Sequence, residues 1–253
     1  MQKNRHTLAL HRNEFGLKPS GSVLRLWFYV LRALRYALII FVMASIGVCL
    51  ILRWLPAPTS AFMLARHVDD LIEKRSFTPI RYQWVSADNI SIHAFEAIIA
   101  AEDQRFFKHY GFDFDAIGLA LQKYLRGGSL RGASTLTQQV AKNLFLSPDK
   151  NFLRKGLEAW FTLLLELLWS KERILVMYLN IAEFGEHLFG VEAASRKYFG
   201  LSARQINRQQ AALLAATLPN PLLLQVQHPS RYLLKRQRWI LTQMQNLQLP
   251  EIR

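Results

Sequence analysis

Hydrophobic positions along the chain follow helical rather than strand-like spacing. After residue 90, most segments place apolar residues three and four positions apart, which covers one face of an α-helix. Alternation of apolar and polar residues is scarce, and only residues 78–88 could supply a short strand. The spacing predicts helices over Ile92–Ala101, Ala116–Tyr124, Leu136–Phe145, Leu153–Leu168, Lys171–Ala182, Arg204–Leu218 and Tyr232–Gln245. We therefore expect a mainly α-helical domain.

A continuous apolar stretch precedes this domain. Residues Tyr36–Leu52 are 17 consecutive uncharged residues, which as a helix would extend about 26 Å, at the lower end of what spans a bilayer. Aromatic residues and arginines flank the stretch, as at a membrane interface. A core helix rarely lacks every charge, and a cleaved signal peptide has a shorter charged region than the one found here. We predict a single transmembrane helix over residues 36–55.

Charge is distributed unevenly around this stretch. Residues 1–35 hold seven Lys and Arg against a single Glu, a net charge of +6. Cytoplasmic segments carry such an excess, so the N-terminus is predicted to be cytoplasmic and the rest of the chain to lie outside. Pro56 and Pro58 discourage continuation of the helix. We expect a linker and membrane-proximal segment over residues 56–78, followed by one domain over residues 79–253.

The composition narrows the classes of function. Lys and Arg outnumber Asp and Glu by 32 to 18, which gives a net charge of +14. This excess fits a polyanionic partner such as nucleic acid, anionic lipid or a phosphate-bearing substrate. A hydrophobic content of 51% excludes intrinsic disorder. Cys49 is the only cysteine, so an internal disulfide framework is excluded.

The first candidate site surrounds a carboxylate on an apolar helix face. Glu102 lies three, four and seven positions after apolar residues, where burial without a partner would raise the pKa of its carboxyl group. A buried Glu paired with an Arg is the alternative. Asp103, Phe106 and His109 follow in a polar, glycine-containing segment of the kind that often carries function. A lone histidine is more often a structural hydrogen-bond partner than a ligand, and no HExxH or CxxC spacing indicates a zinc site.

The second candidate site follows a glycine-rich segment. Three glycines fall within residues 126–132, and Ser134 or Thr135 could then cap a helix whose N-terminus favours an anion. Ser134, Gln138 and Lys142 share one face of that helix and present a hydroxyl, an amide and an ammonium group in a row. A solvated helix face is the alternative, but such a face normally also carries acidic residues.

A third cluster combines cations with one carboxylate: Lys150, Arg154, Lys155 and Glu158. Phosphate binding is the functional interpretation. The alternative is an exposed ion pair between Arg154 and Glu158, which would contribute only a few tenths of a kcal/mol. A fourth segment, Lys171–Asn180, could be an ordinary helix with its termination.

Together these segments resemble the family-51 glycosyltransferases that polymerise peptidoglycan from lipid II, most closely the monofunctional enzymes of Gram-negative bacteria. The motif EDxxFxxHxG is matched by Glu102, Asp103, Phe106, His109 and Gly111. GxSTxTQQxxKN is matched from Gly132 through Asn143, and RKxxE by Arg154, Lys155 and Glu158. The motif ending in YLN is matched at Lys171, Ile174, Leu175, Tyr178, Leu179 and Asn180, and the last motif over Ala211–Pro221. The likeness covers roughly residues 80–240, with Val176 in place of a common Glu and Lys150 in place of a common Arg.

The resemblance implies a lysozyme-like, two-lobed, mainly helical domain that catalyses inverting glycosyl transfer. The growing glycan on undecaprenyl diphosphate would be the donor, and the 4-hydroxyl of lipid II the acceptor, giving β-1,4 bonds. Glu102 would be the general base, and Glu158 would assist on the donor side. Substrate-binding residues implied by the motifs are Asp103, Phe106, His109, Ser134, Thr137, Gln138, Lys142, Asn143, Lys150, Arg154, Lys155 and Asn180.

The resemblance also implies the cellular setting. The chain would cross the cell inner membrane once, with its catalytic domain in the periplasm. It would bind lipid II, the lipid-linked glycan and membrane lipids, with other cell-wall or division proteins as candidate partners, and no nucleic acid. No tightly bound cofactor is implied, but a divalent cation, Mg²⁺ or Mn²⁺, could accompany the diphosphate, at a site the sequence does not identify.

Two other functions remain open from the residues alone. A lysozyme-like glycan-cleaving enzyme also uses a Glu in a helical domain, but it has no evident use for a second, cation-rich site. A non-enzymatic basic membrane protein that binds nucleic acid would carry its domain on the wrong side of the membrane. Ser147–Lys150 matches the SxxK of transpeptidases, but no KTG follows, so we reject that function.

Overall fold

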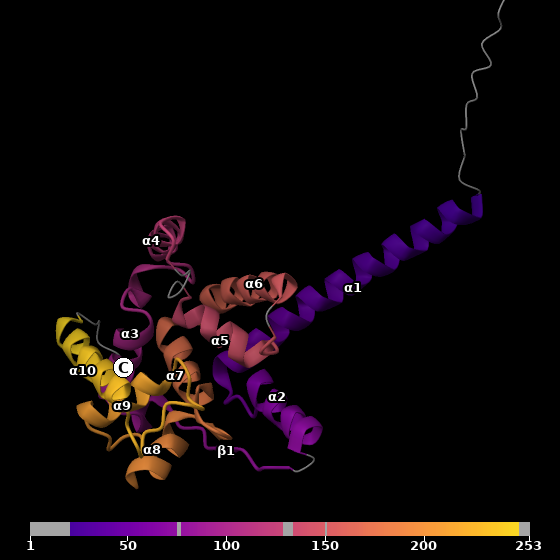
Figure 1. The fold of residues 1–253 in the computed structure, drawn as a ribbon. Helices are drawn as coiled ribbons and strands as arrows, with labels where there is room; N and C mark the ends of the chain where they lie inside the picture. Colours follow the sequence, from indigo (N-terminus) through magenta and orange to yellow (C-terminus); the bar gives the residue numbers. More distant parts are fainter. Residues whose placement is uncertain (1–20, 75–76, 129–133, 150, 248–253) are drawn as a thin grey trace, which may run out of the picture. The chain divides into compact units, whose positions relative to one another are not determined.

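The computed structural model describes the chain outside residues 1–20, 75–76, 129–133, 150 and 248–253 (Figure 1). The chain divides into two units, residues 1–45 and 46–253. The first unit consists, in its described part, of helix α1 (Gly21–Trp54) up to Ser45. Residues Arg25–Trp54 are long and apolar enough to cross a membrane, which is compatible with a single-pass anchor.

Helix α1 begins earlier than the predicted span of residues 36–55. Arg25, Arg32 and Arg35 lie within it, because arginine is a good helix former and a hydropathy boundary is not a helix boundary. Lys3, Arg5, Arg12 and Lys18, which contribute to the predicted basic segment 1–35, lie outside the described residues.

The second unit is mainly helical, as predicted. Its α-helices are α2 (Ala61–Asp69), α3 (Ile92–Glu102), α4 (Phe114–Leu125), α5 (Leu136–Phe145), α6 (Phe152–Leu168), α7 (Lys171–Ile181), α8 (Val191–Phe199), α9 (Arg208–Thr217) and α10 (Arg231–Asn246). A short π-helix, η1 (Asp70–Lys74), and two short 3₁₀-helices, η2 (Ala87–Asn89) and η3 (Phe106–Lys108), lie between some of them. The helix predicted from Arg204 begins at Arg208, because Asn207 and Gln210 form a capping box there. Helix α8 was not predicted.

Helix α7 lies in the hydrophobic core. Every residue from Ile174 to Ile181 is buried, which is typical of a helix surrounded by other elements. Helix α5 packs against both α6 and α7, and α3 packs against α9 and α10 (Figure 1). The core therefore holds together the helices that carry the matched motifs: the end of α3, α5, α6 and α7.

A small three-stranded sheet borders this core. Strand β3 (Leu188–Phe189) lies between β1 (Arg81–Tyr82), which is parallel to it, and β2 (Glu183–Gly185), which is antiparallel. Of the predicted strand over residues 78–88, only β1 forms. Gly190 follows β3 with φ +85°, and a Cβ atom there would lie 2.6 Å from the carbonyl oxygen of Asn180. The hairpin can therefore approach the end of α7 only with glycine at this position.

The end of α1 and the residues after it are bonded to the helical domain. The guanidinium group of Arg173 donates to the carbonyl oxygen of Leu52 at 2.6 Å, and it also bonds that of Leu55. The indole of Trp169 donates to the carbonyl oxygen of Cys49 at 2.7 Å. The hydroxyl of Tyr82 donates to the carbonyl oxygen of Ala57 at 2.6 Å. Residues 56–78, which we expected to form a linker, thus include a docked segment and the helix α2.

Candidate active site

Glu102 ends helix α3 and lies in a network of side chains from three other helices. Its side chain is 15% exposed. The amide of Gln139 on α5 donates to Oε2 at 2.9 Å, and the guanidinium of Arg236 on α10 donates to Oε1 at 3.2 Å. Tyr178 on α7 in turn donates its hydroxyl proton to Oε1 of Gln139 at 3.0 Å. Four helices therefore fix the position of this carboxylate.

The surroundings of Glu102 shift its acidity. Burial raises the pKa of its carboxyl group, which is the largest effect. The hydrogen bond from Gln139 and the positive charges of Arg236 and Lys142 oppose this shift without cancelling it. A carboxylate with a raised pKa that is still held by donors is suited to accept a proton.

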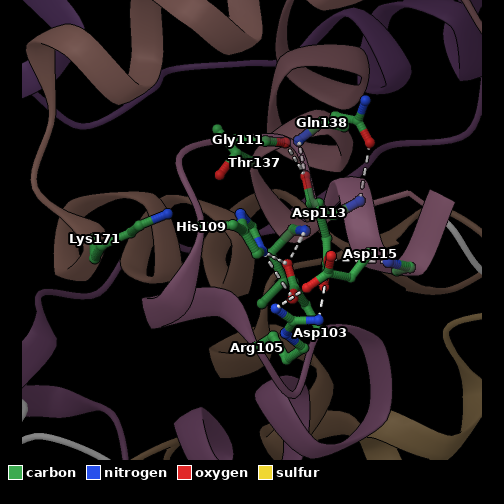
Figure 2. A network of polar contacts seen from close by, with 12 residues as sticks. Asp103, Arg105, His109, Gly111, Asp113, Asp115, Thr137, Gln138 and Lys171 are labelled. Atoms are coloured by element: carbon green, nitrogen blue, oxygen red, sulfur yellow. Dashed lines mark hydrogen bonds and ion pairs between the residues drawn. The ribbon is translucent and has the colours of Figure 1, made fainter. Parts of the chain in front are cut away.

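Asp103 and His109 connect the loop after α3 to the start of α5 (Figure 2). Both side chains are buried. The two carboxylate oxygens of Asp103 lie 3.0 and 3.1 Å from Nε2 of His109, and Oδ2 also accepts the backbone N–H of Leu136 at 3.0 Å. The hydroxyl of Thr135 donates to the carbonyl oxygen of Gly111 at 2.6 Å. These predicted substrate-binding residues therefore have internal partners and hold the loop that follows Glu102.

The polar residues of α5 separate into buried and cavity-lining groups. Gln138 is buried and forms a capping box with Thr135. Thr137 donates to Glu166, which also binds Lys171 at 2.8 Å. The expected continuous polar face of Ser134, Gln138 and Lys142 is therefore interrupted, because Gln138 serves the cap.

Phe106 is fully buried, with the ammonium of Lys171 4.4 Å from the centre of its ring.

The third motif forms a compact ion-pair cluster. Glu158 on α6 is 3% exposed, and its carboxylate binds Arg154 at 2.8 Å and also binds Lys155. Burial lowers the pKa of the nearby Lys142 ammonium, and Arg154 and Lys155 lower it further, whereas the charges of Glu158 and Glu102 raise it. The Arg154–Glu158 pair, expected as exposed in the alternative, is thus largely buried. Lys150 lies outside the described residues.

Asn143 and Asn180 differ in how their polar atoms are used. The side-chain oxygen of Asn143 is buried and has no hydrogen-bond partner among the described residues. The amide of Asn180 donates to the carbonyl oxygens of Val85 at 2.9 Å and Val176 at 2.8 Å, and its oxygen accepts the N–H of Val85 at 2.8 Å. Asn180 therefore fixes the segment before α3, while Asn143 retains a free acceptor.

Glu102 lines one cavity, and Gln139, which donates to it, lines another. One, of about 330 Å³, is lined by Glu102 together with Ser134, Thr135 and Trp239. The other, of about 270 Å³, is lined by Gln139, Lys142 and Asn143, by Phe62 and Arg66 of α2, and by the segment after α9. One cavity thus offers a base and hydroxyl groups, and the other offers an ammonium group and amides.

The lining of the second cavity does not fit a resident metal ion. Glu183 in that lining is bound by Arg66 at 2.8 and 2.9 Å, and Glu158 is already paired with two cations. Among the described residues, no group of three His, Cys, Asp or Glu side chains could hold a metal. The divalent cation expected at the diphosphate stays a prediction.

Comparison with known proteins identifies the relatives of this chain. The profile of the transglycosylase family matches residues 70–245. The chain belongs to the transglycosylase family. It is 50% identical over 218 residues to a protein of Pseudomonas entomophila named biosynthetic peptidoglycan transglycosylase, covering 86% of this chain and 92% of the relative. A protein of Pseudomonas putida with the same name is 51% identical over 220 residues, with the same coverage.

Membership of the transglycosylase family confirms the resemblance seen in the motifs and the mainly helical, lysozyme-like fold. Three residues around Glu102 were not predicted as site residues: Gln139, Tyr178 and Arg236. Gln139 and Tyr178 lie inside the matched motifs and could have been chosen, whereas Arg236 is one of several cations on α10 with no local signal. Phe62 and Arg66 precede the matched region.

Proposed function

We propose that this transglycosylase polymerises the glycan strands of peptidoglycan with Glu102 as its general base. The relatives' name supports the activity, and the reaction serves cell-wall synthesis. The observation that carries the role of Glu102 is its position: a carboxylate with raised pKa that lines one cavity and is held by Arg236 and by Gln139, which lines a second cavity. The acceptor is lipid II and the donor is the glycan on undecaprenyl diphosphate.

In the reaction, Glu102 takes the proton from the 4-hydroxyl of the acceptor sugar. The freed oxygen attacks the anomeric carbon of the donor and forms the new glycosidic bond. The bond from that carbon to the diphosphate oxygen breaks, and the diphosphate leaves with the electron pair. Attack opposite to the leaving group inverts the anomeric carbon and gives a β-1,4 bond. Arg236 and Gln139 keep the base oriented during this transfer.

The leaving diphosphate is stabilised by the cations of the second and third motifs. Lys142 lines the same cavity as Gln139, the partner of Glu102, and its charge is not neutralised by a contacting carboxylate among the described residues. Glu158 assists indirectly, because it binds Arg154 and Lys155 and so holds their charges near Lys142. Fixed positive charges around a developing anion lower the barrier to its departure.

The membrane setting follows from the lipid tails of both substrates. Helix α1 anchors the enzyme in the cell inner membrane, where lipid II and the lipid-linked glycan are confined. The basic N-terminal segment keeps the N-terminus in the cytoplasm, and the catalytic domain is periplasmic.

Incubation of the full chain with labelled lipid II tests the proposed function. We expect glycan strands to lengthen and one undecaprenyl diphosphate to be released for each glycosidic bond that forms. A muramidase should digest the product. Release of fragments from preformed glycan, without polymer from lipid II, would instead identify a glycan-cleaving enzyme. Failure to act on either substrate would contradict the proposal.

A further inference from the structure

Helix α2 lies between the membrane helix and the region that matches the family, and it is held firmly in place. Its N-cap Ser60 is buried and accepts the backbone N–H of Met63. Arg66 forms two hydrogen bonds with Glu183 of β2, at 2.8 and 2.9 Å. A carboxylate oxygen of Asp70, directly after the helix, lies 2.9 Å from Nε2 of His187, in the turn between β2 and β3. The middle and the C-terminal end of α2 are thus held against the hairpin of β2 and β3.

This placement brings α2 to the cavity that contains Lys142. Phe62 and Arg66 both line it. The ring centre of Phe62 lies 5.3 Å from the ammonium nitrogen of Lys142, within the range of a cation–π interaction. The nearby oxygen of Asn143 is buried without a partner among the described residues. The cavity therefore contains an ammonium group free of acidic contacts among the described residues.

An aromatic ring holds an ammonium group in a different way from a carboxylate. The face of the ring attracts the cation through its quadrupole but leaves the charge of the cation unneutralised. A carboxylate in the same place would form an ion pair and compete with an incoming phosphate. Arg66, in contrast, has its guanidinium bound to Glu183 and acts on the position of α2.

We propose that α2 forms one wall of the donor diphosphate site and that Phe62 is a positioning residue, which orients the Lys142 ammonium toward the diphosphate. The proposal rests on the role given above to Lys142. It extends the site beyond the matched region, to a segment that directly follows the membrane helix. The ring acts on the substrate through Lys142 and does not itself react.

The test compares Phe62→Leu, which keeps an apolar side chain but removes the ring, with Phe62→Tyr and Phe62→Trp, which keep a ring. Full-length protein in detergent is used for two measurements: lipid II polymerisation, and the dissociation constant of farnesyl diphosphate as a short polyprenyl diphosphate probe. Phe62→Leu should weaken probe binding roughly 2- to 30-fold, and the two aromatic variants should restore it. Phe77→Leu is the matched control, because Phe77 is exposed and stacks on His67.

A double-mutant cycle distinguishes positioning from a general structural effect. In a Lys142→Ala background, Phe62→Leu should cause no further loss of probe binding, because the ring acts through the ammonium. Equal losses in both backgrounds, or unchanged binding in Phe62→Leu, would overturn the proposal. Normal polymerisation by Lys142→Ala would instead contradict the role of Lys142 itself, so the two failures can be told apart. Melting temperatures of all variants check that the fold is retained.

Discussion

Arg236 and Glu102 form an ion pair at 3.2 Å although they are 134 residues apart in the chain. The pair joins the C-terminal end of α3 to α10 and places a fixed positive charge beside the proposed base. Burial and this charge act in opposite directions on the pKa of Glu102. The acidity of the base is therefore set by two distant parts of the sequence.

Replacing Glu102 by Gln should abolish most of the polymerisation. The amide has nearly the same size and can still accept from Arg236, but it cannot take a proton at neutral pH. We expect the rate to fall by ~10²–10⁴-fold, with a melting temperature close to that of the wild type. Polymer yield and melting temperature should be measured on one preparation. Glu96→Gln, on the same helix and bonded to His93, is the control. A stable Glu102→Gln variant with normal activity would remove Glu102 from the mechanism.

Replacing Arg236 by Gln should change how the rate depends on pH. The guanidinium lowers the pKa of Glu102, so its removal lets the effect of burial raise that pKa further. Because the base must be ionised, the loss of rate on acidification should begin at a higher pH than in the wild type. Polymerisation measured from pH 5 to 8 will check this. Arg238→Gln, a change at an exposed position on α10, should leave the profile unmoved, and an unmoved profile in Arg236→Gln would argue against the electrostatic role.

Lys142 should limit activity at alkaline pH. Burial lowers the pKa of its ammonium group, so the charge needed for the diphosphate is lost at a lower pH than for an exposed lysine. Lys142→Arg retains a charge throughout this range and should extend activity to higher pH, whereas Lys142→Ala should reduce the rate by roughly ten- to a hundredfold at all pH values. Lys235→Arg, at an exposed position, provides the comparison. If Lys142→Arg loses activity at the same alkaline pH as the wild type, the loss must come from the titration of another group.

The topology is testable independently of catalysis. Alkaline phosphatase folds into an active enzyme only outside the cytoplasm, so a fusion after Arg253 should be active because the +6 segment keeps the N-terminus inside. A reporter active only in the cytoplasm, fused at the same position, should be inactive. The reverse pattern would place the catalytic domain in the cytoplasm.

The sequence predicted local features well and distant pairings poorly. Helix α5 and the Arg154–Glu158 pair follow from residues three and four positions apart, which are neighbours on any helix. The amide of Asn180, in contrast, binds Val85, 95 residues earlier, and no local spacing indicates such a partner. Gln138 is predicted to bind substrate, and its capping box with Thr135 is a local feature, but its burial depends on how α5 packs. The role of a polar residue depends on whether the fold already supplies its partner.

The hydrogen bonds from Trp169 and Arg173 to the end of α1 bear on attempts to prepare a soluble fragment of this enzyme. Removal of residues 1–55 would take away the carbonyl oxygens of Cys49 and Leu52, which accept from Trp169 and Arg173. Trp169 is 5% exposed with the end of α1 in place. The fragment would therefore lose the hydrogen bond of the indole N–H and expose part of the ring to water, at a cost of about 0.5–1.5 kcal/mol for the hydrogen bond alone. A fragment that begins after the anchor would thus lose stability as well as its membrane attachment. A fragment that begins near residue 46 would retain these carbonyl groups and their hydrogen bonds to Trp169 and Arg173.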